Sequence, residues 1–562
     1  MSRTFGIFVF AITLVFFGCF FIWPIWEILK GGFIDANGHF TVAYFLEVFA
    51  NPIYMEGLTN SFYLAVCSTL LTISIAVPLA FVADRYVFPL KGVFMALILL
   101  PIMLPPFVGA IGVTQILGEY GMLNAILKSI GLGQYAIDWL GKGRFFGIVL
   151  LNAFSLYPIL YLNAIASLSN IDPAMEEAAE NLGCRGFKKF LTVTLPLMRP
   201  GLFAGCTIVF IWSFTELGVP LMFDYARVAP VQIFNGLKEI GDSPFPYALV
   251  TVVLLFSMSF YAIGKGLFGR ATFAMMAKAT HSREPIKPTF LGKFICFSLF
   301  AVITALALLP HLAVILISFA NDWFDSILPN SFTLNNFEIA LSHPLAVPSI
   351  QNSLIYAGSA TILNVILGVA IAYVVVRSKL PGRNLLDTMA MLPLAVPGLV
   401  IAFGYFVMSL EGRAFDFLNP IENPTALLII AYAVRKMPFV VRAAVAGLQQ
   451  TSVSYEEAAQ NLGCHPIKAS FKITMPLIAA NLLAGAILAF SASMLEVSDS
   501  LILAQKQHYF PITKAIYEFM NLLGDGTFLA SALGVWAMTF LAVTIIGASM
   551  LMGKKLGAIF RF

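Results

Sequence analysis

Residues 172–200 read DPAMEEAAENLGCRGFKKFLTVTLPLMRP, and residues 452–480 read SVSYEEAAQNLGCHPIKASFKITMPLIAA. The two stretches align without a gap at a constant offset of 280 positions (457 − 177 = 280). Two hydrophilic loops this similar, within an otherwise apolar chain, indicate two copies of one docking surface. Their identical positions include Glu176 and Glu456, Glu177 and Glu457, Ala178 and Ala458, Ala179 and Ala459, Gly183 and Gly463, and Cys184 and Cys464.

Each copy is predicted to form a short helix, a turn and a second short helix. Asp172 and Ser452 are good N-cap residues, because their side chains accept a hydrogen bond from the first helical turn. The adjacent glutamates of each copy lie near that turn, where a carboxylate complements the helix dipole. Gly183 and Gly463 are placed to end the helix in a left-handed conformation. An ordinary surface hairpin would show these features once, whereas their repetition in register favours a docking role.

The repeated stretch resembles the signature of binding-protein-dependent ABC importer permeases, which is Glu-Ala-Ala, three residues, Gly, and later a hydrophobic residue with Pro. Both copies contain it in full, and they end in Leu195-Pro196 and Met475-Pro476. The resemblance extends over nearly the whole chain. The chain is similar to the fused permeases that serve the uptake of ferric iron, thiamine or aminoethylphosphonate.

The resemblance implies the partners as well as the activity. Each loop is then a coupling helix seated in a cleft of an ATPase subunit, and the near identity of the loops favours an ATPase homodimer. The ATPase uses ATP, and the chain itself binds no cofactor. A periplasmic solute-binding protein delivers a small solute, with ferric iron among the candidates, to the outer face.

The composition is that of a polytopic membrane protein. Of the 562 residues, 59% are hydrophobic and only 11% are charged, whereas soluble domains have about 25% charged residues. We therefore expect an all-α fold of about 12 lipid-embedded helices. An uncleaved first span is favoured over a signal peptide, because no small-residue cleavage site follows it. The expected spans are 5–24, 62–83, 92–117, 146–168, 201–223, 246–266, 294–318, 353–376, 385–409, 426–448, 479–503 and 532–553.

Positions outside the loops repeat as well. Asn60-Ser61 matches Asn352-Ser353, and Arg85 matches Arg377, at an offset of 292 (352 − 60 = 292). Prolines also recur in the third span of each half, where we expect them to bend the helix and to shape a central gate. These prolines are Pro101, Pro105, Pro106, Pro393 and Pro397.

Basic residues predict the orientation. The stretch 265–293 is the most basic in the chain, whereas 319–350 contains three acidic residues and no Lys or Arg. The positive-inside rule then places the first stretch, both repeated loops and both termini in the cytoplasm. An even number of spans gives each half the same orientation. We therefore predict two parallel six-helix permease units, residues 1–280 and 281–562, in the inner (plasma) membrane.

Five of the charged residues in the predicted spans are candidates for function, because charges there are costly and usually functional. Glu216 and Glu496 align in the fifth spans, and Asp499 follows on the same helical face as Glu496. Arg435 and Lys436 lie in the fourth span of the second half. One interpretation is ion pairing that lets both helices insert. The other is a substrate pathway in which one or both bases meet an anionic solute.

Other functional classes lack their motifs. The sequence contains no Gly-rich phosphate loop, no metal-binding cysteine or histidine motif, no nucleophile elbow and no nucleic-acid-binding module. A membrane enzyme is therefore disfavoured. A self-powered secondary transporter remains the alternative, with Glu216, Glu496 and Asp499 as possible protonatable groups. Such a carrier has no need for two copies of a cytoplasmic docking loop.

Overall fold

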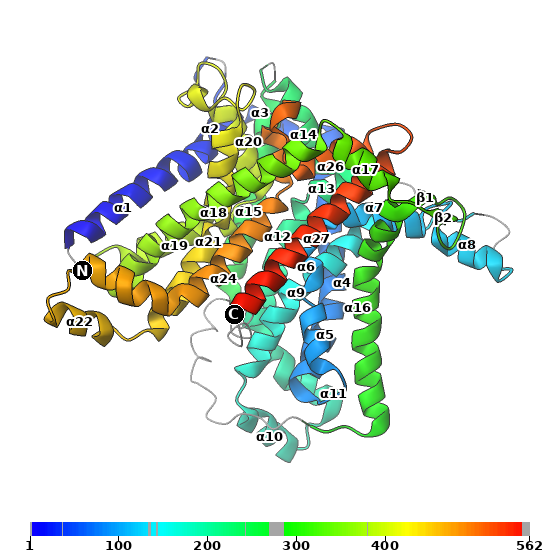
Figure 1. Ribbon diagram of the computed structural model, residues 1–562, viewed down its shortest axis with the longest axis horizontal. Coiled ribbons are helices and arrows are strands. Elements are labelled where there is room, and N and C mark those ends of the chain that lie inside the picture. The colour runs from blue at the N-terminus through cyan, green and yellow to red at the C-terminus, as the bar shows by residue number, and fades with distance from the viewer. Residues whose placement is uncertain are drawn as a thin grey trace. The chain divides into compact units, whose positions relative to one another are not determined.

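The computed structural model describes residues 3–552, apart from 36, 133–135, 142–143, 242, 269–285 and 379. Nearly all regular structure in these residues is helical (Figure 1). The exception is a two-stranded antiparallel sheet of β1 (Ala320–Asp322) and β2 (Ser331–Phe332). The expected all-α class is confirmed.

The chain folds into two compact units, each assembled from separate segments. The first unit contains residues 1–51, 233–254 and 337–561, and the second contains 52–232 and 255–336. The opening helices of each half thus belong to the unit that holds most of the other half. The predicted boundary at residue 280 lies outside the described residues.

The second unit consists mainly of the body of the first half. Its helices are α4 (Pro52–Arg85), α5 (Lys91–Leu97), α6 (Leu100–Met103), α7 (Pro106–Leu117), α8 (Met122–Ser129), α9 (Phe145–Ser169), α10 (Pro173–Asn181), α11 (Gly186–Lys189), the π-helical η2 (Phe190–Thr194), α12 (Leu195–Phe214), α13 (Gly218–Met222) and α16 (Phe290–Phe319). Three helices contribute residues to both units, namely α14 (Ala229–Gly236), α15 (Phe245–Phe268) and α17 (Asn335–Ser342).

The first unit repeats this order of elements. It contains α1 (Arg3–Phe17), η1 (Gly18–Ile22), α2 (Trp23–Phe33), α3 (Ala43–Ala50), η3 (Leu237–Glu239), α18 (Ala346–Arg377), α19 (Arg383–Met391), η5 (Leu392–Leu394), α20 (Gly398–Met408), η6 (Asp416–Leu418), α21 (Thr425–Gln450), α22 (Ser454–Asn461), α23 (Pro466–Ala469), the π-helical η7 (Ser470–Thr474), α24 (Met475–Met494), α25 (Ser498–Leu503), η8 (Gln507–Tyr509), α26 (Ile512–Met520) and α27 (Gly526–Met552).

The helices account for the predicted membrane spans. Among the described residues, nine helices are long and apolar enough to cross a membrane, or up to 11 if each of two bent helix pairs is one span. The 26-residue α21 is predicted as a further span. It fails the same test because Arg435, Lys436 and Arg442 place three charges in each of its 18-residue windows. A polytopic protein with about 12 spans is consistent with this set.

The third span of each half is broken. In the first half, the segments Lys91–Ile102 and Pro106–Ser129 meet at 99°, and in the second half Arg383–Leu394 and Gly398–Met408 meet at 98°. A proline is the N-cap residue of the helix after each break. Proline lacks the N–H that would continue the preceding turn. The predicted bending is confirmed, whereas a gating role stays a prediction.

The first long helix of each half packs on the third span of the other half. A Cβ atom on Gly404 of α20 would lie 2.8 Å from the carbonyl oxygen of Pro24 in α2. A Cβ atom on Gly112 of α7 would lie 1.9 Å from the carbonyl oxygen of Pro310 in α16. Both glycines occupy the same repeat position (404 − 112 = 292). The crossing therefore occurs once in each unit and requires a residue without a side chain.

The repeated Asn-Ser pairs also have a structural role. Ser61 Oγ accepts a hydrogen bond from the N–H of Ala229 at 2.9 Å, and Ser353 Oγ accepts one from the N–H of Ile512 at 2.7 Å. These N–H groups are the first of α14 and α26, respectively. The matched serines therefore cap equivalent helices that follow the fifth spans.

Candidate functional site

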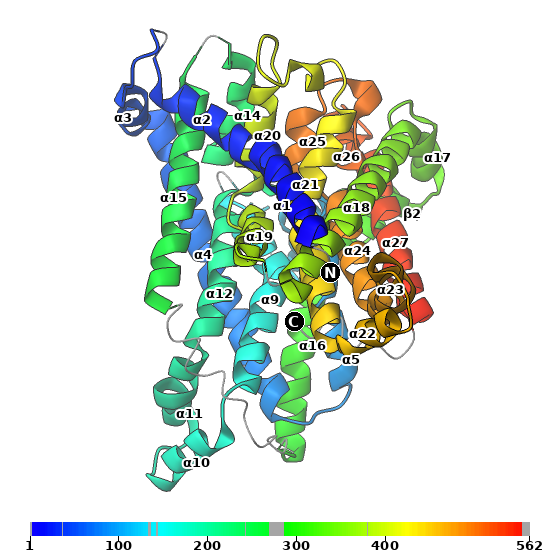
Figure 2. The ribbon, with the colours of Figure 1, turned by 90° about the vertical axis from the view of Figure 1, so that its left-hand side faces the viewer.

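The two repeated loops end their first helix in the same way. They lie beyond the ends of the long helices that they connect, α9 to α12 and α21 to α24 (Figure 1 and Figure 2). α10 and α22 are followed by Gly183 with φ 81° and Gly463 with φ 86°. In the first loop the N–H of Cys184 donates to the carbonyl of Ala179 at 2.9 Å, and the second loop repeats this bond at 2.9 Å. This is the Schellman motif, so the predicted glycine termination is confirmed in both copies.

The start of the loop differs slightly between the copies. Asp172 is the N-cap residue of α10, and its carboxylate accepts a hydrogen bond from the N–H of Ala174 at 3.0 Å. In the second copy α22 begins at Ser454, and Val453 stands at the N-cap position. Ser452 Oγ still accepts a hydrogen bond from the N–H of Ser454 at 3.3 Å. The expected cap is thus confirmed for Asp172 and displaced by one residue for Ser452.

Both loops expose apolar side chains on their surface. Leu182 and Leu462, at equivalent positions, are each 88% exposed. Exposed apolar patches are typical of protein interaction surfaces. Further exposed apolar residues are Met175 and Phe187 in the first loop, and Tyr455 and Phe471 in the second. Of the predicted docking residues, Glu177, Ala178, Gly183, Glu457, Ala458 and Gly463 are exposed, whereas Ala179 and Ala459 are half-buried.

The first loop carries an additional surface ion pair. Lys189 Nζ donates a hydrogen bond to the carboxylate of Glu180, and this bond holds the pKa of Glu180 below its usual value. The equivalent positions of the second copy are Ala469 and Gln460. The two surfaces therefore share the exposed leucine but differ in local charge.

Glu176, one of the predicted docking residues, is buried inside the protein. Its carboxylate accepts two hydrogen bonds from the guanidinium of Arg85, at 2.5 and 2.6 Å. Thr194 Oγ1 donates a third at 2.5 Å. Because Arg85 is the last residue of α4, Glu176 ties the docking loop to the end of the second span.

The second loop has an equivalent anchor with different bonds. Glu456 accepts hydrogen bonds from Tyr373 Oη at 2.6 Å, Thr474 Oγ1 at 2.8 Å and Arg377 Nε at 3.4 Å. Arg377 also donates to the carbonyl of Thr451 at 2.7 Å. The anchor again joins the loop to the last residue of the second span, here α18.

The residues that donate hydrogen bonds to these buried glutamates were not predicted to be functional. The repeat does mark them, because Arg85 matches Arg377 and Thr194 matches Thr474. Neither match alone indicates a contact, since Arg85 and Glu176 are 91 positions apart. The signal available in the sequence was that the arginine and the glutamate recur together in both halves.

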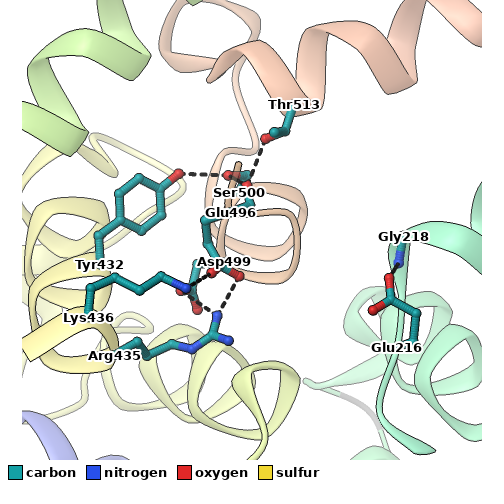
Figure 3. Close-up of polar contacts among 9 residues, drawn as sticks. All are labelled: Glu216, Gly218, Tyr432, Arg435, Lys436, Glu496, Asp499, Ser500 and Thr513. Carbon is teal, nitrogen blue, oxygen red and sulfur yellow. Dashed lines mark hydrogen bonds and ion pairs between the residues drawn. The ribbon is translucent and has the colours of Figure 1, made fainter. Parts of the chain in front are cut away.

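Four of the intramembrane charges form a cluster in the first unit (Figure 3). Arg435 donates hydrogen bonds to the carboxylate of Glu496 and, at 3.1 Å, to Oδ2 of Asp499. Lys436 Nζ donates to Oε2 of Glu496 at 2.7 Å. The predicted pairing of the bases of the fourth span with the carboxylates of the fifth is therefore confirmed.

The cluster lies where two spans are broken. Glu496 stands between α24 and α25, and Asp499 lies in the first turn of α25. A Cβ atom on Gly398, the first residue of α20, would lie 2.2 Å from the guanidinium carbon of Arg435. The exposed side-chain fraction is 18% for Arg435 and 0% for Asp499. Charges this shielded stay ionised only with opposite partners, and two bases and two acids provide them.

Glu216 makes different contacts in the second unit. Its Oε1 accepts hydrogen bonds from the N–H groups of Gly218 at 3.1 Å and Val219 at 3.2 Å (Figure 3 shows the first of these). These are the first residues of α13, so the carboxylate lies at a helix N-terminus, where the dipole favours it. Glu216 belongs to the second unit, whereas the four-residue cluster lies in the first.

No group of three His, Cys, Asp or Glu side chains within the described ranges is arranged to hold a metal ion. The loops and the charge cluster are the two candidate sites, one for docking and one within the membrane.

Two repeated units of membrane-spanning helices, each with a broken third span and an exposed loop between its fourth and fifth spans, define a membrane transport protein. The family model for the "binding-protein-dependent transport system inner membrane component" matches residues 76–272 and 364–549. The chain belongs to this family, the inner-membrane permease subunits of ABC importers. It is therefore a multi-pass transporter subunit with one family repeat in each half.

Curated relatives agree with this assignment. A putative ferric transport system permease protein of Haemophilus influenzae is 28% identical over 509 residues, covering 87% of this chain and 76% of the relative. A ferric transport system permease protein of Actinobacillus pleuropneumoniae is 29% identical over 81% of this chain and 64% of its own length. A molybdenum transport system permease protein of H. influenzae is 34% identical over 36% of this chain and 89% of its own length. The aligned stretch of 212 residues is about as long as one family repeat.

Proposed function

We propose that the chain is the translocation subunit of an ATP-driven importer, and that its two loops bind two ATPase subunits. The observation that carries the proposal is the matched pair of Schellman-capped helices, each presenting a leucine that is 88% exposed. An ATPase homodimer has two equivalent surfaces that such a pair would fit. ATP-driven closure of the dimer would draw the loops together and reorient the central cavity.

The proposed orientation has both loops and both termini in the cytoplasm. Lys188 and Lys468 lie in the loops, and the linker between the halves is the most basic part of the chain. Basic loops are retained on the cytoplasmic side during insertion. The opposite face would receive a periplasmic solute-binding protein.

Ferric iron is the proposed solute. Two relatives that align with more than four-fifths of this chain are named as ferric transport permeases. The pathway residues proposed for it are Glu216, Arg435, Lys436, Glu496 and Asp499. The last four of these pair within the cluster, which offsets their charge and leaves two carboxylates close to the breaks in the helices.

The test is uptake of radioactive ferric iron into membrane vesicles that contain the permease, with and without the ATPase subunit. We expect uptake only when the ATPase and internal ATP are both present, because the chain has no phosphate loop. A proton or sodium gradient alone should give no uptake above vesicles without the permease. Gradient-driven uptake by the permease alone would instead establish the secondary transporter.

A further inference from the structure

A buried carboxylate ties each docking loop to the end of a span that is remote from it in the sequence. We propose that Arg85 and Arg377 are positioning residues that couple each loop to its second span, α4 or α18, through Glu176 and Glu456. The inference rests on the proposed docking function and adds a route by which movement of the loop reaches the membrane. The arginines themselves contact neither the ATPase nor the solute.

The geometry of the first anchor, the Arg85–Glu176 pair, supports coupling between the docking loop and α4. The docking helix α10 is continuous in the chain with α9 and, through α11 and η2, with α12. Its hydrogen bonds to α4 run from Arg85 to Glu176, and Thr194 at the end of η2 binds the same carboxylate. One carboxylate thus joins three elements. Bidentate bonds between an arginine and a carboxylate fix orientation as well as distance.

The chemistry of the anchor also indicates that the pair positions the loop and does not mainly stabilise the fold. The exposed side-chain fractions are 4% for Arg85 and 1% for Glu176. Removing such charges from water is costly, and well-packed apolar residues often stabilise a protein equally well. An apolar contact, however, would allow the loop to slide along the helix. The charged pair holds a defined geometry, which is what transmission of movement requires.

The two anchors should contribute unequally. Glu456 has Tyr373 and Thr474 as close partners, and Arg377 contributes only one bond to it, at 3.4 Å. The repeat position of Tyr373 is Phe81 (373 − 81 = 292), whose ring contacts that of Phe190 at 5.2 Å and cannot bind a carboxylate. The first anchor therefore depends on its arginine, whereas the second can retain its carboxylate without it.

The experiment compares paired neutralisations in the permease reconstituted with its ATPase and binding protein. Arg85→Gln with Glu176→Gln removes the first anchor without leaving either of its two members as an unpaired buried charge, although Asp84, 3.2 Å from Arg85 Nε and 19% exposed, loses a partner. Arg377→Gln with Glu456→Gln removes the second. We expect the ATPase to co-purify normally, while solute uptake per ATP hydrolysed falls about tenfold for the first pair and less for the second, within the usual range of coupling effects.

A matched control neutralises an exposed pair of the same type. Arg227 and Glu56 are 3.4 Å apart with side chains 72% and 49% exposed, so Arg227→Gln with Glu56→Gln should leave uptake per ATP unchanged. Leu182→Asp with Leu462→Asp should abolish co-purification, which tests docking separately. Failure of the wild-type chain to bind the ATPase would refute the proposed function itself.

Several results would overturn the inference while docking stands. Uptake per ATP equal to that of the exposed-pair control would show that the anchors transmit nothing. Loss of co-purification in the anchor variants would place these residues in the docking surface instead. If the double variants fold poorly, the single variant Arg85→Lys tests the inference instead. It keeps the charge but not the two parallel bonds, so intermediate coupling supports the inference and full coupling refutes it.

Discussion

The guanidinium of Arg435 holds two carboxylates at the point where the third and fifth spans of the second half are interrupted. Lys436 binds one of the same carboxylates at 2.7 Å. With two bases and two acids, the cluster is balanced in charge. An incoming anion would therefore have to compete with carboxylates of the protein itself, and a cation such as ferric iron with its two bases. This arrangement favours a structural role in the resting state, and contact with solute requires at least one pair to open.

Neutralising one member should show which role dominates. We expect Arg435→Gln to lower the amount of folded permease, because removing one partner of a buried pair costs about 3–5 kcal/mol. Glu496→Gln should act similarly, and Arg435→Gln with Glu496→Gln should restore the yield. Yield after membrane extraction and uptake per folded molecule are the measurements.

Arg442 offers a control on the same helix. It lies 3.3 Å from Asp387, and its side chain is 50% exposed against 18% for Arg435, so Arg442→Gln should lower the yield less than Arg435→Gln. If the double variant regains yield but not uptake, Arg435 or Glu496 lies on the solute pathway. Normal yield and uptake in every single variant would contradict both roles.

At the scale of elements, glycine sets how closely the exchanged helices approach. α16 crosses α7 at Gly112, and α2 crosses α20 at Gly404. In both cases the nearest atom to an added Cβ is backbone or lies in a proline ring, which cannot turn away as a flexible side chain would. The broken third spans are therefore held in place by the opening helix of the other half.

Gly112→Ala and Gly404→Ala should each destabilise the permease. Overpacking of a well-packed site costs about 1–3 kcal/mol, and Gly112→Ala should be the more severe because its Cβ would lie 1.9 Å from a carbonyl oxygen. Thermal unfolding in detergent measures the effect. The helical glycines Gly92 and Gly358 have no atom within 4 Å of an added Cβ. Alanine there should be harmless, and equal losses at all four positions would refute this account of the crossing.

Local features of the elements could be predicted because their causes are local. A glycine at the end of a helix and a proline within a span restrict their own turns, so the left-handed caps and a bend in each third span could be predicted, whereas the angles of 99° and 98° could not. The burial of Glu176 could not be predicted in this way. Its partner is 91 positions away, and adjacent Glu176 and Glu177 look equivalent until tertiary packing turns one inward.

At the scale of the whole molecule, the repeat predicted two similar halves but not how they are interleaved. Sequence offsets compare one half with the other and contain no information about which half an apolar helix packs against. Lipid-facing and protein-facing helices also have similar compositions, because the lipid is as apolar as the protein interior. The exchange of the opening helices therefore became visible only in the structure.

The exchange of opening helices predicts how the two halves behave when they are expressed as separate chains. Residues 1–280 and 281–562, expressed as two chains in one cell, should assemble and co-purify, because α1–α2 pack with α18–α20 and α16 packs with α7. Removing residues 1–51 from the first chain should weaken co-purification severalfold, since it takes away one of the two exchanged helices. A deletion in the linker, residues 269–285, should weaken co-purification less, because it removes neither exchanged helix. Halves that insert into the membrane but fail to co-purify would show that the exchanged helices do not hold the molecule together.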